Sequence, residues 1–149
     1  MIVQNAGQKE DKMDIIATVD EMKEWGMCED TLQYCAKHGI TDFTTEVITE
    51  HRNKIPYEDF IFLIERVDPS YLPQVMKDSD EDVRLTVADR IDISYLPQMI
   101  GDSDWAVRLT VAERIDISYL PQMVEDSNWA VRQAVAGRMR IEEVDTLPD

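Results

Sequence analysis

The 149-residue sequence predicts an all-α fold, a short α-solenoid of 24-residue repeats preceded by an N-terminal helical cap. The main observation is that one segment occurs three times along the chain. It reads RVDPSYLPQVMKDSDEDVRLTVAD from Arg66, RIDISYLPQMIGDSDWAVRLTVAE from Arg90 and RIDISYLPQMVEDSNWAVRQAVAG from Arg114. A fixed period of roughly 20–50 residues marks units that bury their apolar faces only against their neighbours. Such stacks form extended binding surfaces, so the repeats favour binding over catalysis.

The N-terminal region, residues 1–65, is predicted to be helical. Residues 1–12 are polar and are expected to be disordered. Apolar residues at helical spacing then predict short helices in the rest of the region. They are expected at Asp14–Trp25, Glu29–His38, Asp42–Arg52 and Pro56–Glu65. Residues 53–65 also look like a degenerate half-repeat, because Glu65-Arg66 falls where Asp89-Arg90 and Glu113-Arg114 fall later.

Each full repeat within residues 66–137 is expected to hold a short helix and a longer one. The short helix contains a proline and is expected to have 3₁₀ character. Ser70, Ser94 and Ser118 are the N-cap candidates of the short helices, because a serine hydroxyl accepts hydrogen bonds from helix N–H groups. The longer helices are expected to follow from Ser79, Ser103 and Ser127, with acids near their positive N-terminal ends. Residues 138–149 begin a fourth copy and then become polar, which predicts a C-terminal cap or tail.

An arginine lies on the apolar face of each long helix. A helical wheel of the second repeat places Arg108 at the centre of its apolar arc. A charged side chain on a buried face must be paired and hydrogen-bonded. Aspartates recur at the same period just before the long helices, so we interpret the two rows as a structural ladder and not as a phosphate site. The ladder comprises Arg84, Arg108 and Arg132 with Asp78, Asp102 and Asp126.

The chain is acidic along its whole length. It carries 31 acidic and 15 basic residues, a formal charge of −16. Residues 1–65 hold 14 acids and 6 bases, and residues 66–149 hold 17 and 9. Such a surface repels nucleic acid and anionic membranes and favours a partner protein with a basic surface. Acidity that serves solubility alone is the alternative.

The chain is expected in the cytoplasm. It has no apolar run long enough to span a membrane, and its start lacks the apolar stretch of a signal peptide. Its two cysteines, Cys28 and Cys35, suit a reducing compartment. No metal site is predicted, because the acids that begin at Asp78 lack the glycine that a calcium loop needs where Val83 stands.

Acids and aromatic residues of the repeats are the candidate partner-binding residues. Trp105 and Trp129 occupy equivalent positions in adjacent repeats, where the first repeat has Glu81. They predict either an exposed aromatic anchor or side chains that fill gaps between repeats, and the sequence favours gap filling. The candidate acids are expected on outward positions of the first repeat and of the segment before it. They are Glu58, Asp80, Glu81, Asp82 and Asp89.

The repeat motif resembles a known family. In residues 66–137 the pattern Leu-x2-(Met/Val)-hydrophobic-x-Asp-Ser-(Asp/Asn)-x2-Val-Arg-x2-Val-Ala is similar to the leucine-rich repeat variant, which is close to HEAT-like repeats. The resemblance implies α and 3₁₀ helices that alternate in a right-handed superhelix, and a role as an adaptor or binding platform. One relative is described as carrying an iron–sulfur cluster. Such a cluster typically needs four cysteines and this chain has two, so no cofactor is expected.

These features suggest three functions. The first is a non-enzymatic interaction module whose acidic surface binds a basic protein. Its sharpest form is a nucleic-acid mimic that inhibits a DNA- or RNA-binding protein, as anti-CRISPR proteins do. The second is a cytoplasmic repeat adaptor that is acidic only for solubility. The third is an enzyme similar to the HEAT-like pigment lyases, although the chain contains no recognisable catalytic motif. We favour the first.

Overall fold

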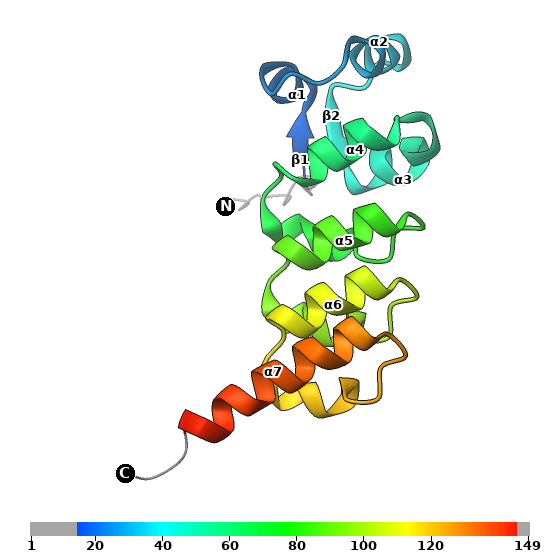
Figure 1. Cartoon of the computed structure of the whole chain (residues 1–149). Helices are drawn as coiled ribbons and strands as arrows, with labels where there is room; N and C mark the ends of the chain where they lie inside the picture. The colour runs from blue at the N-terminus through cyan, green and yellow to red at the C-terminus, as the bar shows by residue number, and fades with distance from the viewer. Residues whose placement is uncertain (1–14, 146–149) are drawn as a thin grey trace, which may run out of the picture. The chain divides into compact units, whose positions relative to one another are not determined.

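The computed structural model describes the backbone of residues 15–145 and most side chains between residues 17 and 140. The chain divides into two compact units, Met1–Ile55 and Pro56–Asp149, each with its own secondary structure (Figure 1). The disorder expected at residues 1–12 lies outside the described residues.

The first unit combines a small sheet with short helices. Strands β1 (Ile15–Thr18) and β2 (Asp42–Thr44) pair in an antiparallel two-stranded sheet, in which Ala17 lies opposite Phe43. The helices are α1 (Val19–Glu24), α2 (Glu29–His38), α3 (Thr45–His51) and the 3₁₀ helix η1 (Arg52–Lys54). The core of this unit contains buried side chains from both strands and helices. They include Ala17, Met22, Met27, Cys35, Phe43 and Ile48.

The purely helical N-terminal cap predicted from the sequence is wrong at two places. The segments Asp14–Trp25 and Asp42–Arg52 were expected to be helical from their start, but each enters its helix through a strand. Each helix starts only after a threonine N-cap, Thr18 or Thr44, whose hydroxyl accepts a hydrogen bond from an N–H three residues later. An N-cap residue has an extended backbone, so Thr18 and Thr44 can also serve as the last residues of the two paired strands. The helix predicted at Glu29–His38 is confirmed with the same bounds.

The second unit is a stack of helices. It consists of α4 (Tyr57–Ile64), η2 (Pro69–Gln74), α5 (Glu81–Arg90), η3 (Ile93–Met99), α6 (Trp105–Arg114), η4 (Ile117–Met123) and α7 (Trp129–Asp145). Each repeat contributes one 3₁₀ helix and the α-helix that follows it. The helices α4 to α7 stack in chain order, and each contacts the next (Figure 1). The all-α solenoid predicted for the repeats is confirmed.

The core of the stack repeats with the sequence. One leucine from each 3₁₀ helix and two valines from each long helix are almost fully buried at equivalent positions. They are Leu72, Leu96, Leu120, Val83, Val107, Val131, Val87, Val111 and Val135. Each repeat therefore contributes the same apolar face, and that face is buried only because the next unit covers it.

Aspartates, and not the predicted serines, cap the helices of the repeats. The 3₁₀ helices begin after Asp68, Asp92 and Asp116, each of which accepts the N–H of the serine two residues later. Asp80 and Asp104 cap α5 and α6, and Asn128 accepts a helix N–H at the start of α7. The serine prediction for the short helices is wrong because the aspartate two residues before each serine takes the capping role.

The last helix runs past the end of the third repeat. α5 and α6 end at Arg90 and Arg114, and the isoleucine after each arginine has an extended backbone. An aspartate follows each isoleucine and caps the next 3₁₀ helix, whereas Met139 and Arg140 stand at these positions after the third repeat. α7 therefore continues to Asp145. Over its described part, the predicted C-terminal cap or tail is an extension of this helix.

Candidate interaction surfaces

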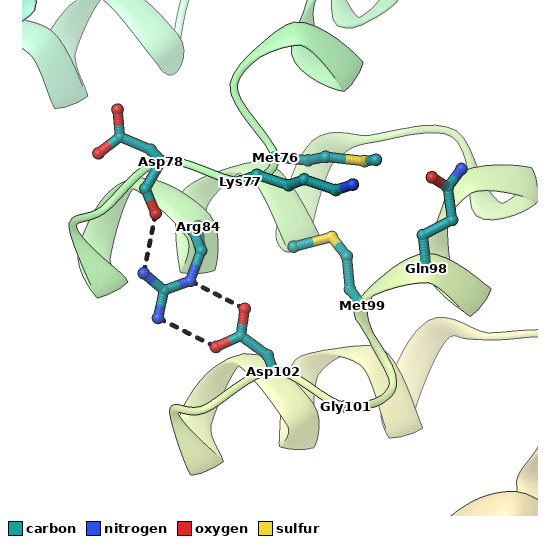
Figure 2. A pocket seen from close by; sticks show the side chains of 8 residues that line it. All are labelled: Met76, Lys77, Asp78, Arg84, Gln98, Met99, Gly101 and Asp102. Atoms are coloured by element: carbon teal, nitrogen blue, oxygen red, sulfur yellow. Dashed lines mark hydrogen bonds and ion pairs between the residues drawn. The ribbon is translucent and has the colours of Figure 1, made fainter.

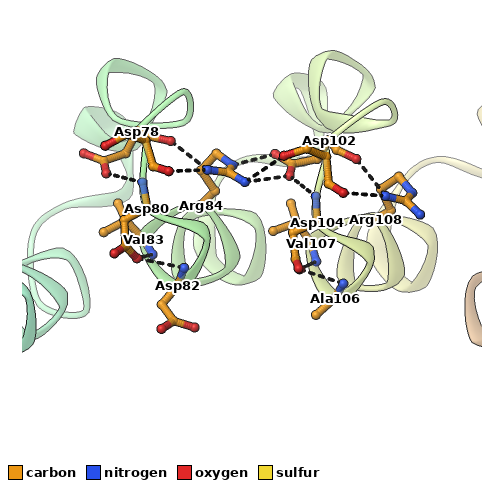
Figure 3. A network of polar contacts seen from close by, with 12 residues as sticks. Asp78, Asp80, Asp82, Val83, Arg84, Asp102, Asp104, Ala106, Val107 and Arg108 are labelled. Carbon is orange, nitrogen blue, oxygen red and sulfur yellow. Dashed lines mark hydrogen bonds and ion pairs between the residues drawn. The ribbon is translucent and has the colours of Figure 1, made fainter. Parts of the chain in front are cut away.

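Arginines and aspartates join successive repeats on one side of the stack (Figure 3). Arg84 donates from Nε and Nη2 to the two carboxylate oxygens of Asp102, at 2.8 and 3.0 Å. Arg108 makes the same two bonds to Asp126, at 2.7 and 3.0 Å. The Nη1 group of Arg108 also donates to the backbone oxygen of Asp102, at 2.8 Å. Each of these arginines thus ties the loop of its own repeat to the carboxylate of the next one.

The two ion pairs are largely shielded from water. In the second pair, 13% of the Arg108 side chain and 8% of the Asp126 side chain are exposed. The hydrogen bond from Arg108 lowers the pKa of the Asp126 carboxyl, and the N–H of Asn128 contributes in the same direction. The same pairing raises the pKa of Arg108. Both groups are therefore charged at neutral pH and bound to each other, which suits a structural contact.

The remaining members of the predicted ladder lie at its two ends. Arg132 donates from Nη1 to the backbone oxygens of Asp126 and Ser127, at 2.6 and 3.0 Å. It is exposed, and it has no ion pair within the described part of the chain. At the other end, the carboxylate of Asp78 accepts the N–H of Asp80 at 2.9 Å. Phe60 occupies the ladder position one repeat before Arg84.

A second row of arginines was not predicted from the sequence. Arg90 donates to the backbone oxygens of Ile64 and Val67, and Arg114 donates to those of Ala88 and Ile91. Arg138 binds the equivalent pair in the next repeat. These carbonyls lie at or just after the end of the preceding long helix, where backbone acceptors need partners. The signal was available in the sequence, because arginine recurs there at every period.

A cavity of about 360 Å³ opens beside the first ion pair (Figure 2). Its lining includes the thioethers of Met76 and Met99, and Gly101, which has no side chain at a position where the neighbouring repeats carry Lys77 and Glu125. The other lining residues are Lys77, Asp78, Arg84, Gln98 and Asp102. Arg84 and Asp102, which line the cavity, bind each other.

The first residues of the long helices form a second surface, which we call the helix-start edge. It comprises Tyr57, Glu81, Trp105 and Trp129, which begin α4, α5, α6 and α7 at intervals of 24 residues. Tyr57 is 43% exposed, Trp105 47% and Trp129 67%. The tryptophans therefore do not fill gaps between repeats, which corrects the interpretation that the sequence favoured. Tyr57 was missed, although it stands one period before Glu81.

Carboxylates act electrostatically on Tyr57 at one end of the helix-start edge. The negative charge of Asp82 is the main cause of a raised pKa of the Tyr57 phenol, and Glu58 and Asp80 act in the same direction. Of the predicted acids, these three thus act on the phenol of one exposed tyrosine.

The other predicted acids occupy different positions. Glu81 is exposed at the start of α5, within the helix-start edge. Asp89 is exposed near the opposite end of the same helix, about 10 Å from Asp82 at 1.5 Å per residue. Asp89 therefore lies apart from the carboxylates that act on Tyr57.

The first unit holds a cluster of aromatic and titratable residues. The Tyr34 hydroxyl lies 2.9 Å from Nδ1 of His51, and the Tyr34 and His38 rings are 4.3 Å apart between centroids.

The two cysteines of the first unit differ in exposure. Cys28 is exposed, whereas Cys35 is buried and its burial raises the pKa of its thiol. A cavity of about 250 Å³ beside α1 and α2 is lined by Val19, Asp20, Lys23, Leu32, Ala36, Ile40 and Thr41. Within the described residues, no three histidine, cysteine or acidic side chains are grouped as metal ligands.

The arrangement of the repeats is similar to that of one solved structure. A protein described as a leucine-rich repeat variant with a novel repetitive protein structural motif aligns with a TM-score of 0.54 and 30% sequence identity. The chain resembles a leucine-rich repeat variant in sequence and in fold. The alignment covers 61% of this chain and 39% of that chain, so this chain spans about two fifths of its length.

The resemblance inferred from the motif is therefore confirmed. No protein-family model matches the sequence, and no curated protein matches it. Repeat folds of this kind typically form protein-interaction modules and are typically not catalytic. No helix of the described residues is long and apolar enough to cross a membrane.

Proposed function

We propose that this protein is a non-enzymatic interaction module whose helix-start edge and adjacent acids bind a basic protein surface. The observation that carries the proposal is the exposed ring of Tyr57, whose phenol lies within the electrostatic influence of Glu58, Asp80 and Asp82. Carboxylates next to exposed aromatic rings suit arginine and lysine side chains, because ion pairing and cation–π attraction act on the same group. Trp105 and Trp129 extend this edge with apolar contact area of the type that anchors protein interfaces.

In its sharpest form, the module mimics nucleic acid and inhibits a DNA- or RNA-binding protein, as anti-CRISPR proteins do. The net charge of −16 supports this form. A second support is the row of Asp68, Asp92 and Asp116, which repeats at the period of the stack. Hydrogen bonds from Ser70, Ser94 and Ser118 lower the pKa of these three exposed carboxyls, so all of them are ionised. A periodic row of fixed negative charges is what replaces the phosphates of a nucleic-acid strand.

The test compares two variants of equal net charge with the wild type. The site variant neutralises the five candidate acids as Glu58→Gln, Asp80→Asn, Glu81→Gln, Asp82→Asn and Asp89→Asn. Asparagine at residue 80 keeps the helix cap, as Asn128 does in the third repeat. The control variant neutralises five exposed acids of the first unit as Asp20→Asn, Glu24→Gln, Glu29→Gln, Asp30→Asn and Glu50→Gln. Each protein is immobilised and used to capture partners from host lysate at low and high salt.

The proposal requires a captured protein that the wild type and the control variant retain and the site variant loses. Capture must also weaken at high salt, because exposed charges are screened beyond about 10 Å at 0.1 M salt. Competition with duplex DNA or RNA for the purified partner then tests the nucleic-acid mimic. Equal loss from both variants contradicts a specific acidic site. Retention by both variants at high salt favours the adaptor, which would bind through Trp105 and Trp129.

A further inference from the structure

The C-terminal end of the stack exposes a face that the chain buries in its first two repeats. Ala88 and Ala112 are fully buried, and their counterpart Ala136 is exposed. At a second set of equivalent positions, Met76 is 9% exposed, Ile100 is half-buried and Val124 is 42% exposed. These differences arise at positions that the next repeat covers in the interior of the stack. We call Val124, Arg132 and Ala136 the end face.

Arg132 has unused hydrogen-bonding capacity on this face. Arg84 and Arg108 each donate from Nε and Nη2 to a carboxylate of the following repeat. Arg132 keeps the two bonds from Nη1 to the carbonyls of its own loop, so its guanidinium is held in the same orientation. Its Nε and Nη2 groups have no acceptor within the described part of the chain. The end face therefore presents a fixed two-donor fork beside small apolar side chains.

The interior of the stack shows what chemistry covers this face. On the second repeat, the equivalent face is covered by the third repeat, which supplies Asp126 to Arg108 and packs α7 against α6. The charge of the end face suits a carboxylate as well, because Arg132 is the charged residue among the three that define it. A carboxylate that accepts both fork donors gains two charge-assisted bonds in a planar geometry that lysine does not provide.

In this chain the loop aspartates Asp102 and Asp126 already bind Arg84 and Arg108. The end face therefore suits an aspartate that is supplied from outside the stack.

We propose that the end face is a docking site for a helical repeat of another protein, which places an aspartate from the turn before its helix on Arg132. The aspartate accepts the Nε and Nη2 donors, and the start of that helix packs on Ala136 and Val124. This site is separate from the helix-start edge and does not depend on the function proposed above.

The probe is a synthetic peptide of residues 115–137, the segment that supplies the equivalent aspartate to Arg108. It is titrated into the isotope-labelled full chain, and amide and arginine Nε resonances are followed by NMR. We expect shifts at Val124, Arg132 and Ala136. Arg132→Gln, and an Asp126→Asn form of the peptide, are each expected to weaken binding at least about tenfold. Arg140→Gln, which removes the same charge from an exposed site on α7, is expected to leave binding unchanged.

A second measurement, of stability in a chain with one more repeat, applies if the free peptide does not fold. One more copy of residues 114–137 is inserted after Gly137, so that Arg132 becomes an interior residue. In this longer chain, Arg132→Gln is expected to lower the unfolding midpoint as much as Arg108→Gln does, whereas in the native chain it has little effect. The proposal is overturned if Arg132→Gln costs no stability in the longer chain. It is also overturned if the peptide binds equally well to the Arg132→Gln and Arg140→Gln variants.

Discussion

Replacement of Arg108 by alanine, with Arg132→Ala as its matched control, tests the role of the ion pairs in the stack. The two arginines occupy equivalent positions and make the same two bonds to backbone carbonyls of their own loops. Only Arg108 also binds a carboxylate of the next repeat, through Nε and Nη2. The difference between the two variants therefore isolates the contact between repeats.

The expected magnitude follows from the burial of the pair. Loss of one partner of a buried ion pair typically costs about 3–5 kcal/mol, because the other charge stays without a counter-charge. Asp126 would keep the N–H of Asn128, so we expect a cost near the lower limit, about 3 kcal/mol. Arg132→Ala loses only exposed bonds to carbonyls and is expected to cost at most about 1 kcal/mol. Arg108→Lys restores the charge without the planar fork, so it should recover only part of the loss.

The assay is thermal and urea unfolding of the three variants followed by far-UV circular dichroism. For a unit of this size, about 3 kcal/mol lowers the unfolding temperature by roughly 10–20 °C. The Arg132→Ala midpoint should stay within a few degrees of wild type. Equal midpoints for Arg108→Ala and Arg132→Ala would refute the assignment of the pair as a structural contact.

Three further outcomes are expected. Trp105→Ala and Trp129→Ala should leave the unfolding midpoint nearly unchanged, because both side chains are exposed, and should raise the off-rate of a captured partner in surface plasmon resonance. The lowered pKa of Asp126 stabilises the fold fully above about pH 4, its unfolded-chain value, and this contribution is lost as the pH falls through the lower folded value. The free energy of unfolding of Asp126→Asn should therefore fall less than that of the wild type when the pH is lowered from neutral to acidic. Asp104→Ala should cost about 1 kcal/mol in urea unfolding through loss of the cap, whereas Asp104→Asn should cost little.

The repeats were predictable because the apolar pattern of the sequence and the helical units of the structure share the same period of 24 residues. The period placed an arginine on the apolar side of each long helix and an aspartate before it, which indicated that the two would meet. The wheel of a single helix contained no information on which repeat supplies the carboxylate. Arg84 takes its partner from the following repeat because its side chain extends along the stack toward Asp102.

The tryptophans show where helical periodicity fails. Trp105 falls within the apolar arc of its helix, and the wheel therefore grouped it with the buried residues Val107 and Val111. A helical side chain leans over the turn that precedes its own Cα. At the first position of α6 there is no preceding turn of the same helix, so the indole projects past the helix start and remains 47% exposed. The wheel describes direction around the axis and not position along it.

The strands of the first unit could not be predicted from the sequence, for a different reason. β1 and β2 contain four and three residues, which is too short for a period of two to be distinguished from a helical period. Their pairing joins segments more than twenty residues apart, such as Ala17 and Phe43, so no local pattern reveals it. The capping threonines were visible in the sequence, but a threonine marks a helix start only when the residues before it are known to be extended.

The distribution of charge in the repeats supports the proposed binding role. Most of their arginines are used inside the stack: Arg84 and Arg108 bind aspartates, while Arg90, Arg114 and Arg138 bind backbone carbonyls of the preceding repeat. These cations have few donors left for solvent or for a partner. The acids Glu58, Glu81 and Asp82 are exposed to water. If acidity served solubility alone, acids would not need to lie near the exposed ring of Tyr57, whose pKa they raise. The placement of the acids, more than their number, favours a basic partner.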